Sequence, residues 1–240
     1  MNIEDGYNCN KCLNRGNTMK AVKIGGMWYE RFTECECMKV RRSIARMKAS
    51  GLEKSIKAQR LETFKAEKPW QKAMLEAAKA YIAEGVKTGA WLYIGGQAGS
   101  GKTHICTAVA RELLYAGYEV RYVIWEQVKK ELKAVINEPE YAEKMNKLES
   151  AEVLYIDDLF KPIQGAEPTK ADMQIAFELF NYRYANRMPT IISSELFFDD
   201  IYAIDQATEG RIRERCGDRY NVMIEREDSR NLRRSNIKKV

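Results

Sequence analysis

Eight consecutive residues carry the most specific chemical pattern of the chain: Gly96-Gln97-Ala98-Gly99-Ser100-Gly101-Lys102-Thr103. Their glycines and the closing Lys-Thr pair fit the phosphate-binding loop that joins a buried strand to a helix. Glycines allow the backbone to curl until several N–H groups point at one phosphate, and the positive end of the helix adds to that field. Lys102 supplies a charge for the β- and γ-phosphates, and the Thr103 hydroxyl can ligate Mg²⁺. The sequence therefore predicts a site for ATP or ADP with Mg²⁺; a glycine-rich turn without a ligand is the alternative.

Two acidic residues, Asp157 and Asp158, follow directly on the apolar run at 153–156. At such a strand end we expect Asp157 to ligate Mg²⁺ and Asp158 to polarise the attacking water. Asp158 is one C–C bond, about 1.5 Å, shorter than the glutamate of many related sites, so slow or assembly-dependent turnover is expected. A capped strand end with two solvated aspartates is the alternative.

Four cysteines form two close pairs near the start of the chain, Cys9-x2-Cys12 and Cys35-x-Cys37, separated by 22 residues. Paired spacing of this kind is typical of a structural Zn²⁺ site with four thiolates and no open position. Metal binding would fold a segment that is too small to hold itself together. Free buried thiols and disulfides are the alternatives. Four thiolates around a dication leave the module acidic, which favours protein docking over a grip on nucleic acid.

Strands and helices alternate from residue 69 onward. Strands are expected at 90–94, 120–124, 153–156 and 190–193, and helices at 70–85, 102–116, 125–136, 141–148 and 169–187. This alternation indicates an α/β fold with a parallel sheet covered on both faces. Before it, residues 1–37 contain a short strand-like run at 27–29, and residues 38–68 read as basic and helical with a break at Ser50-Gly51.

Composition narrows the class of protein. The chain has 240 residues, 45% hydrophobic and 31% charged, which is ordinary for a globular protein. No run approaches the roughly 18 apolar residues of a membrane span, and the first residues lack a secretory signal, so a cytoplasmic protein is expected. The net charge is +7 over residues 38–68, −6 over 69–210 and +5 over 211–240. Two basic segments around an acidic centre suggest a polyanionic partner.

Three isolated side chains complete the inventory. His104 follows the phosphate-binding loop and belongs to the residues expected around the nucleotide, although its ring is expected to pack against the sheet rather than act as a base. Cys106 and Cys216 are expected to be ordinary core residues.

With these motifs, residues 50–240 resemble the AAA+ ATPases of the DnaC/DnaI helicase-loader group, including those of phages and prophages, and are similar to the IstB transposition helpers. The resemblance implies a five-stranded sheet of order 5-1-4-3-2 and ATP bound between neighbouring subunits of an oligomer or spiral. It also implies delivery of a hexameric DnaB-type replicative helicase onto single-stranded DNA. The implied parts are a zinc-binding, helicase-docking module at 1–46, a helical linker at 47–68 and the AAA+ domain at 69–240.

The segment 189–195 resembles the sensor-1 strand beside the γ-phosphate, but Glu195 stands where relatives usually place asparagine. Ser194 is then the better candidate for orienting water, while Glu195 could pair with a neighbouring subunit's arginine. A plain core strand with a polar end is the alternative.

Arginines near the carboxyl end match two further family segments. Residues 209–216 resemble the arginine-finger segment, in which Arg211 fits slightly better than Arg215; the two are four apart and share one helical face. Residues 229–234 resemble the sensor-2-like motif, with Arg233 at the arginine position. The alternatives are a basic surface helix and a frayed basic tail.

Two helical segments are candidates for partner contacts. Residues 125–150 occupy the position of an extra helical element that contacts DNA in the family, and its charge comes from Lys129, Lys130 and Lys133. In the basic segment after the cysteines, apolar residues at helical spacing suit a helix laid against a partner: Ile44, Met47, Leu52 and Ile56. A solvated face is the alternative in both cases.

The leading interpretation is an ATP-dependent loader of the replicative helicase. A transposition helper on duplex DNA and a nucleotide-switched adaptor without turnover remain as rivals, and a small-molecule kinase is more remote.

Overall fold

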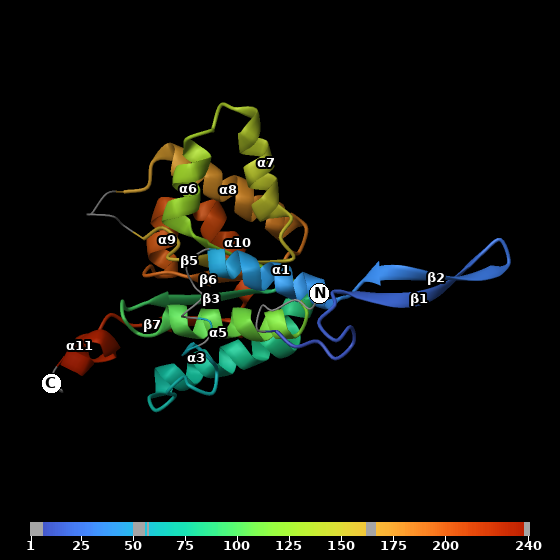
Figure 1. Cartoon of the computed structure of the whole chain (residues 1–240). Coiled ribbons are helices and arrows are strands. Elements are labelled where there is room, and N and C mark those ends of the chain that lie inside the picture. The colour runs from blue at the N-terminus through green and yellow to red at the C-terminus, as the bar shows by residue number, and fades with distance from the viewer. Residues whose placement is uncertain (1–6, 50–55, 57, 162–166, 238–240) are drawn as a thin grey trace.

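The computed structural model describes residues 7–49, 56, 58–161 and 167–237 (Figure 1). The strands are β1 (Asn17–Ile24), β2 (Met27–Glu34), β3 (Trp91–Gly96), β4 (Val120–Ile124), β5 (Val153–Asp157), β6 (Thr190–Ser193) and β7 (Asn221–Ile224). The helices are α1 (Cys37–Met47), α3 (Pro69–Ala80), η2 (Tyr81–Gly85, π-helical), α4 (Val86–Thr88), α5 (Lys102–Tyr115), α6 (Trp125–Lys133), α7 (Pro139–Glu149), α8 (Lys170–Ala185), α9 (Phe198–Ile204), α10 (Gln206–Cys216), η3 (Asp228–Arg230, 3₁₀) and α11 (Leu232–Ile237). Of the helices in these stretches, none combines the length and apolar character that a membrane span requires.

Five strands form a parallel sheet in the order β4-β5-β6-β3-β7 within the described chain. Counted along the chain from β3, these strands read 5-1-4-3-2 from the β7 edge, which confirms the order implied by the resemblance. β3 and β5 are buried along their whole length because their apolar runs lie between two helical layers. The carboxyl ends of neighbouring strands meet at one edge of the sheet, where ligands of such folds bind.

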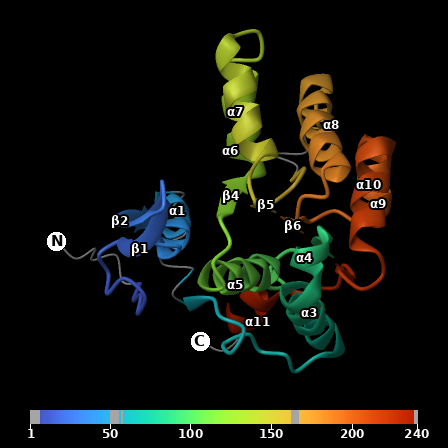
Figure 2. The same ribbon diagram turned by 90° about the vertical axis from the view of Figure 1, so that its right-hand side faces the viewer.

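Helices cover both faces of this sheet, with α3 and α5 on one side and α8, α9 and α10 on the other (Figures 1 and 2). Side chains of β3 alternate between the two layers. Leu92 and Ile94 join the core under α3 and α5, whereas Trp91 and Tyr93 join the opposite core. The Trp91 ring lies 5.5 Å from the ring of Phe180 on α8. The α/β prediction is confirmed.

Helix α1 closes the β4 edge of the sheet. The Ser43 hydroxyl accepts the backbone N–H of Val120 at 3.1 Å, so a side chain takes the place of a neighbouring strand. Val40 and Met47 are buried, at 2% and 0% exposure. Because Met47 belongs to the core under α3 and α5, α1 is packed on the parallel sheet, and Cys37 at its start is held there with it.

The expectation that α1 and the following segment lay apolar residues against a partner differs from the structure. Met47 belongs to the main core, and Ile44 and Ile56 are partly buried against it. The apolar face is covered by β4 and α5 of the same chain. Leu52 and the break at Ser50-Gly51 lie outside the described residues.

The helical prediction for the linker at 47–68 is wrong for residues 59–68, which are irregular with a turn at 61–63. The hydroxyl of Thr63 accepts the N–H of Arg60 at 3.1 Å, and side-chain bonds of this type compete with a helix. Gln71 Oε1 accepts the N–H groups of residues 67 and 68, which fixes an extended entry into α3. The domain boundaries themselves stay predictions.

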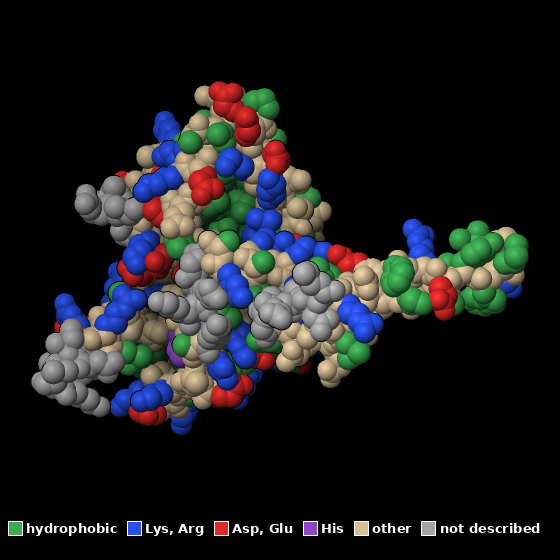
Figure 3. All heavy atoms as spheres, viewed as in Figure 1, with side chains coloured by type: hydrophobic (Ala, Val, Ile, Leu, Met, Phe, Trp, Pro, Cys, Tyr) green, Lys and Arg blue, Asp and Glu red, His purple; other side chains and the backbone are tan. Residues whose placement is uncertain are grey.

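Strands β1 and β2 form an antiparallel hairpin that projects away from the sheet (Figure 1). Its turn at Gly25-Gly26 has positive φ at both residues, as two-residue hairpin turns favour. The sequence predicted only a short strand at 27–29, because neither strand buries one face and the apolar residues do not alternate. Large apolar side chains lie along the hairpin and at its far end (Figure 3), each between 48% and 69% exposed: Met19, Ile24, Met27, Trp28, Tyr29 and Phe32.

Candidate nucleotide-binding site

The phosphate-binding loop joins β3 to α5, in the strand–loop–helix context that the sequence predicted. Gly99 and Gly101 have φ of +74° and +95°, a region that glycine reaches without strain. A Cβ at Gly99 would lie 2.3 Å from Oδ1 of Asn231, so the loop leaves no room for a side chain there. The Ser100 hydroxyl donates to the carbonyl oxygen of Gln97 at 2.8 Å and fixes the curl from within.

Lys102 is buried at the start of α5. Its ammonium donates to the carbonyl oxygens of Gly96 at 2.9 Å and Gln97 at 2.7 Å. Burial lowers the pKa of Lys102, and the charges of Glu195 and Asp158 oppose that shift. A phosphate at this position would replace two neutral acceptors with charged ones, which a buried ammonium binds more strongly.

Three hydroxyl groups converge on the carboxylate of Asp157. Thr103 donates to Oδ1 at 3.2 Å, Ser193 donates to the same oxygen, and Tyr122 donates to Oδ2 at 3.1 Å. Burial raises the pKa of Asp157, and the charge of Asp158 adds to this, while the three hydroxyls act in the opposite direction. Thr103 and Asp157 thus lie within reach of one ion, and their oxygen atoms are ligands that fit Mg²⁺.

A cavity of about 250 Å³ opens beside these residues, and it brings together segments far apart in the sequence. It is lined by Gln59, Gly99, Gly101, Lys102, Thr103, His104, Asp158, Lys161, Glu195, Leu232 and Arg233. The His104 ring packs edge-on against Phe64 at 5.4 Å, so the expectation that it packs against the sheet is wrong. Phe64 is buried in the turns before α3, a placement that the helical prediction for this segment did not contain.

Asp158 and Glu195 meet at one cation, Lys161. Its Nζ lies 3.0 Å from Oδ2 of Asp158 and 3.1 Å from Oε1 of Glu195. Asp158 has φ of +57°, and its N–H donates to the hydroxyl of Ser193 at 3.1 Å, which fixes the turn after β5. Glu195 was predicted as a partner for a neighbouring subunit's arginine; within this chain its partner is Lys161.

Ser194 does not line the cavity. Its hydroxyl donates to the carbonyl oxygen of Leu159 at 2.7 Å, accepts the N–H of Leu196 at 3.1 Å, and is buried. Neighbouring residues at a strand end point to opposite sides, so it is Ser193 that reaches Asp157. The role predicted for Ser194 in orienting water therefore does not fit its hydrogen bonds.

The segment after β7 is tied to the phosphate-binding loop. The N–H of Leu232 donates to the carbonyl oxygen of Gly99 at 3.0 Å, and the N–H of Glu227 donates to Oε1 of Gln97 at 2.9 Å. Arg233 lines the cavity as the sensor-2-like assignment requires. Up to this residue the tail is anchored rather than frayed.

Arg211 and Arg215 lie on α10, outside the residues that line the nucleotide cavity. The Arg211 guanidinium donates to Oδ1 of Asn181 at 2.8 Å and lies 4.9 Å from the ring of Phe177. Arg215 lies 4.9 Å from the ring of Tyr184 and donates to its carbonyl oxygen. These two arginines therefore do not reach the nucleotide cavity of their own chain.

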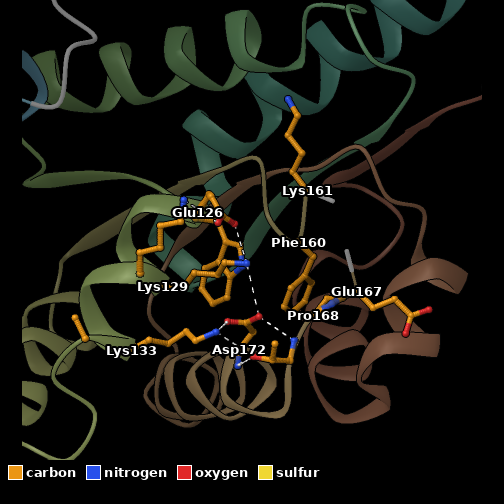
Figure 4. Close-up of a pocket in the computed structure, with 12 residues that line it drawn as sticks. Glu126, Lys129, Lys133, Phe160, Lys161, Glu167, Pro168 and Asp172 are labelled. Carbon is orange, nitrogen blue, oxygen red and sulfur yellow. Dashed lines mark hydrogen bonds and ion pairs between the residues drawn. The ribbon is translucent and has the colours of Figure 1, made fainter. Parts of the chain in front are cut away.

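A larger cavity, of about 650 Å³, lies between α6 and the start of α8 (Figure 4). The three lysines predicted for DNA contact border it, but they share two carboxylates, which offset most of their charge. Lys129 pairs with Glu126 at 2.7 Å and with Asp172 at 3.6 Å, Lys133 pairs with Asp172 at 3.1 Å, and the exposed Lys130 pairs with Glu126 at 3.4 Å. The positive charge that this face offers to nucleic acid is correspondingly small.

The four cysteines come together between the hairpin and α1. All four sulfur atoms lie within 4.8 Å of one another, with 3.8 Å between Cys9 and Cys35 and 3.6 Å between Cys12 and Cys37. Tetrahedral Zn–S bonds of about 2.3 Å place sulfur atoms about 3.8 Å apart. The donor set therefore fits Zn²⁺, whereas Cys106 and Cys216 are buried in the main cores as expected.

Sequence reasoning missed four residues at the nucleotide site: Gln59, Tyr122, Lys161 and Ser193. Asn231 stood in the sensor-2-like segment, but no role was predicted for it. Ser193 could have been found from strand alternation, because it shares a sheet edge with Asp157. The others depend on strand register or on the path of a loop, for which the sequence carries no local signal.

The fold and the site define an AAA+ P-loop protein. The chain belongs to the family of IstB-like ATP binding proteins, whose model matches residues 34–233.

Individual relatives agree with this assignment. Phage-like element PBSX protein XkdC of Bacillus subtilis (strain 168) is 36% identical over 228 residues, which are 91% of this chain and 82% of that protein. Replicative helicase loader DnaI of the same organism is 29% identical over 125 residues, 51% of this chain and 38% of that one. A crystal structure of the DnaC helicase loader has the same fold, with a TM-score of 0.60 and 19% identity over 69% of this chain and 96% of that chain.

Proposed function

We propose that this protein is an ATP-dependent loader that delivers a hexameric replicative helicase onto single-stranded DNA in the cytoplasm of a bacterium or phage-infected host. The observation that carries the proposal is the cavity in which Lys102, Thr103, Asp158 and Arg233 meet. The sequence match to the helicase loader DnaI, which extends over half of this chain, supports the choice of substrate.

ATP binding rests on this chain's own groups. The N–H groups of the loop and the ammonium of Lys102 would hold the phosphates, and Thr103 and Asp157 would hold Mg²⁺, which would supply positive charge to offset that of the phosphates. Arg233 reaches the same cavity from the C-terminal segment. Asp158 lines the same cavity, and in this proposal it orients a water molecule toward the γ-phosphate. Together these groups give the site the parts of an ATPase.

Hydrolysis is proposed to need a neighbouring subunit. Arg211 and Arg215 lie outside the cavity of their own chain, so an arginine would reach the γ-phosphate of the next subunit. Arginines that act in this way are worth about 10³ to 10⁵ in rate in comparable enzymes. ATP would thus link subunits into an oligomer or spiral, and hydrolysis would release it.

The amino-terminal module is proposed to hold the helicase. The hairpin exposes apolar side chains on both of its faces, and an exposed patch of this kind marks a protein contact. Near its end, Lys20, Lys23 and Arg31 outnumber Glu30, which suits an apolar cleft with an acidic rim on the helicase. The bound Zn²⁺ would hold the hairpin against α1 and hence against the ATPase domain.

The family match favours a second candidate, a helper ATPase that regulates a transposase on duplex DNA. The two functions differ in both partner and DNA. An adaptor that binds nucleotide without turnover is distinguished by measuring hydrolysis with helicase and single-stranded DNA present.

The test is co-purification of the tagged full-length protein with the replicative helicase in the presence of ATP, for the wild type and for Trp28→Ser/Phe32→Ser. We expect the helicase to be retained by the wild type and lost by the variant. Tyr202→Ser, which removes an aromatic residue 52% exposed on α9, is the matched control and should retain it. Retention of a transposase with preference for duplex DNA would instead establish the second candidate.

A further inference from the structure

Lys161 is the one lysine besides Lys102 among the described residues that line the nucleotide cavity. It is not part of the loop, strand-end or arginine motifs of the chain. Its ammonium has three N–H donors. Two of them are accounted for by Asp158 at 3.0 Å and Glu195 at 3.1 Å, both of which line the same cavity. Among the described residues no other side chain pairs with this ammonium, so its third donor is available to a ligand.

The charge balance explains why a carboxylate is tolerated at Glu195. A second acidic side chain beside Asp158 would repel the terminal phosphate of a nucleotide. Lys161 offsets one of these two charges. Burial lowers the pKa of Lys161, but its hydrogen bonds and ion pairs with Asp158 and Glu195 outweigh burial and raise the pKa overall. The lysine is therefore a full positive charge at neutral pH.

Packing of the preceding residue, Phe160, fixes the position of the chain at Lys161. Its neighbour Phe160 packs against Trp125 with ring centroids 5.5 Å apart, at the base of α6. Figure 4 shows Lys161 pointing away from the Phe160 ring. The anchored ring of Phe160 therefore fixes the start of the lysine side chain, which borders both the larger cavity and the nucleotide cavity.

We propose that Lys161 donates its third N–H to the terminal phosphate of bound ATP, held in position by Asp158 and Glu195, and so makes the site prefer ATP over ADP. This inference rests on the proposed nucleotide site. ADP lacks the phosphate that Lys161 would contact, so the lysine contributes to binding of one nucleotide and not the other. Glu195 then acts as a positioning residue for Lys161.

The test is the affinity of the full-length protein for ATP and for ADP with Mg²⁺, measured by fluorescence titration. Lys161→Met should weaken ATP binding about 10- to 100-fold, the value of a charge-assisted hydrogen bond, and change ADP binding less than about 3-fold. Unchanged ADP affinity also shows that the variant folds. Glu195→Gln in the Lys161→Met background should restore part of the ATP affinity, because it removes a repelling charge.

Two controls keep the outcomes separate. Lys147→Met removes an exposed lysine that pairs with Glu143 on α7, and should alter neither affinity. Lys102→Ala should abolish binding of both nucleotides. The inference is overturned if Lys161→Met weakens the binding of ATP and ADP equally, or weakens the binding of neither nucleotide. The nucleotide site itself still stands in that case, provided that Lys102→Ala abolishes the binding of both. If Lys102→Ala leaves both affinities unchanged, the proposed site fails and the inference with it.

Discussion

The backbone N–H of Leu232 donates to the carbonyl oxygen of Gly99 at 3.0 Å, so the C-terminal segment is hydrogen-bonded to the loop that is proposed to hold the nucleotide. Asn231 fills the space above the same glycine, and Arg233 lines the cavity. Occupancy of the loop and position of the C-terminal segment are therefore linked.

Gly99→Ala tests this link. The new methyl group would lie 2.3 Å from Oδ1 of Asn231 and would force a positive φ on alanine, so the segment must move away. We expect ATP affinity to fall at least 10-fold, an effect of about 1.4 kcal/mol. Gly117→Ala is the control: Gly117 also has a positive φ, of +98°, but nothing lies within 4 Å of its added methyl group, so ATP affinity should be unchanged. Equal ATP affinity in both variants and the wild type would show that nucleotide binding by the loop does not depend on the position of the C-terminal segment.

Asp157→Asn tests the metal site through stability. Burial raises the folded-state pKa of Asp157, so the folded protein holds this proton more firmly than the unfolded chain does. The free energy of unfolding therefore falls as pH rises from the unfolded-state pKa through the folded-state pKa. At pH 7 the ionised carboxylate therefore costs stability. We expect Asp157→Asn to melt at the same or a higher Tm than the wild type without nucleotide, and to lose the Mg²⁺-dependent part of the shift with ADP. A lower Tm with the Mg²⁺ effect intact would refute the assignment.

Arg211→Ala tests the arginine in trans. Hydrolysis by the assembled protein should fall about 10³-fold with ATP affinity unchanged. Arg213→Ala, on the same helix and paired with Glu209, is the control and should hydrolyse normally. Mixing Arg211→Ala with Lys102→Ala subunits should restore part of the rate, since each supplies what the other lacks. No recovery of hydrolysis on mixing, or a full rate in Arg211→Ala alone, would contradict this role of Arg211. Arg215→Ala, measured in parallel, shows whether Arg215 is the arginine that acts in the neighbouring subunit instead.

Cys12→Ser tests the zinc cluster. Elemental analysis should give one zinc per wild-type chain and less than half of that for the variant, because a structural Zn²⁺ site loses a thiolate ligand. ADP binding should persist, since the cluster lies outside the nucleotide cavity, whereas helicase retention should be lost. Cys106→Ala removes a thiol of the main core and should keep the metal. Full zinc content in Cys12→Ser would exclude this cysteine as a ligand.

Much of the site could be predicted because its residues follow one another along the chain. The loop from Gly96 to Thr103 and the strand end at Asp157 are local patterns, and a parallel sheet brings strand ends together whatever the details. The order of the five strands came from the family resemblance.

Other features depend on contacts that no local pattern encodes. Tyr122 reaches Asp157 through the register of β4 against β5, and Lys161 reaches Glu195 because the turn after β5 adopts positive φ at Asp158 and Phe160. The hairpin was underestimated because neither of its faces is buried. The apolar residues of α1 looked free because the β4 edge that they cover lies 70 to 80 residues further along the chain.

The central claim is that the loop around Lys102 binds ATP, and calorimetric titration of Mg²⁺–ATP into the full-length protein tests it most directly. The account predicts one ATP per chain for the wild type and an affinity at least 100-fold lower for Lys102→Ala, about 2.7 kcal/mol. Equal affinity in the two proteins, or no binding to the wild type, would contradict it.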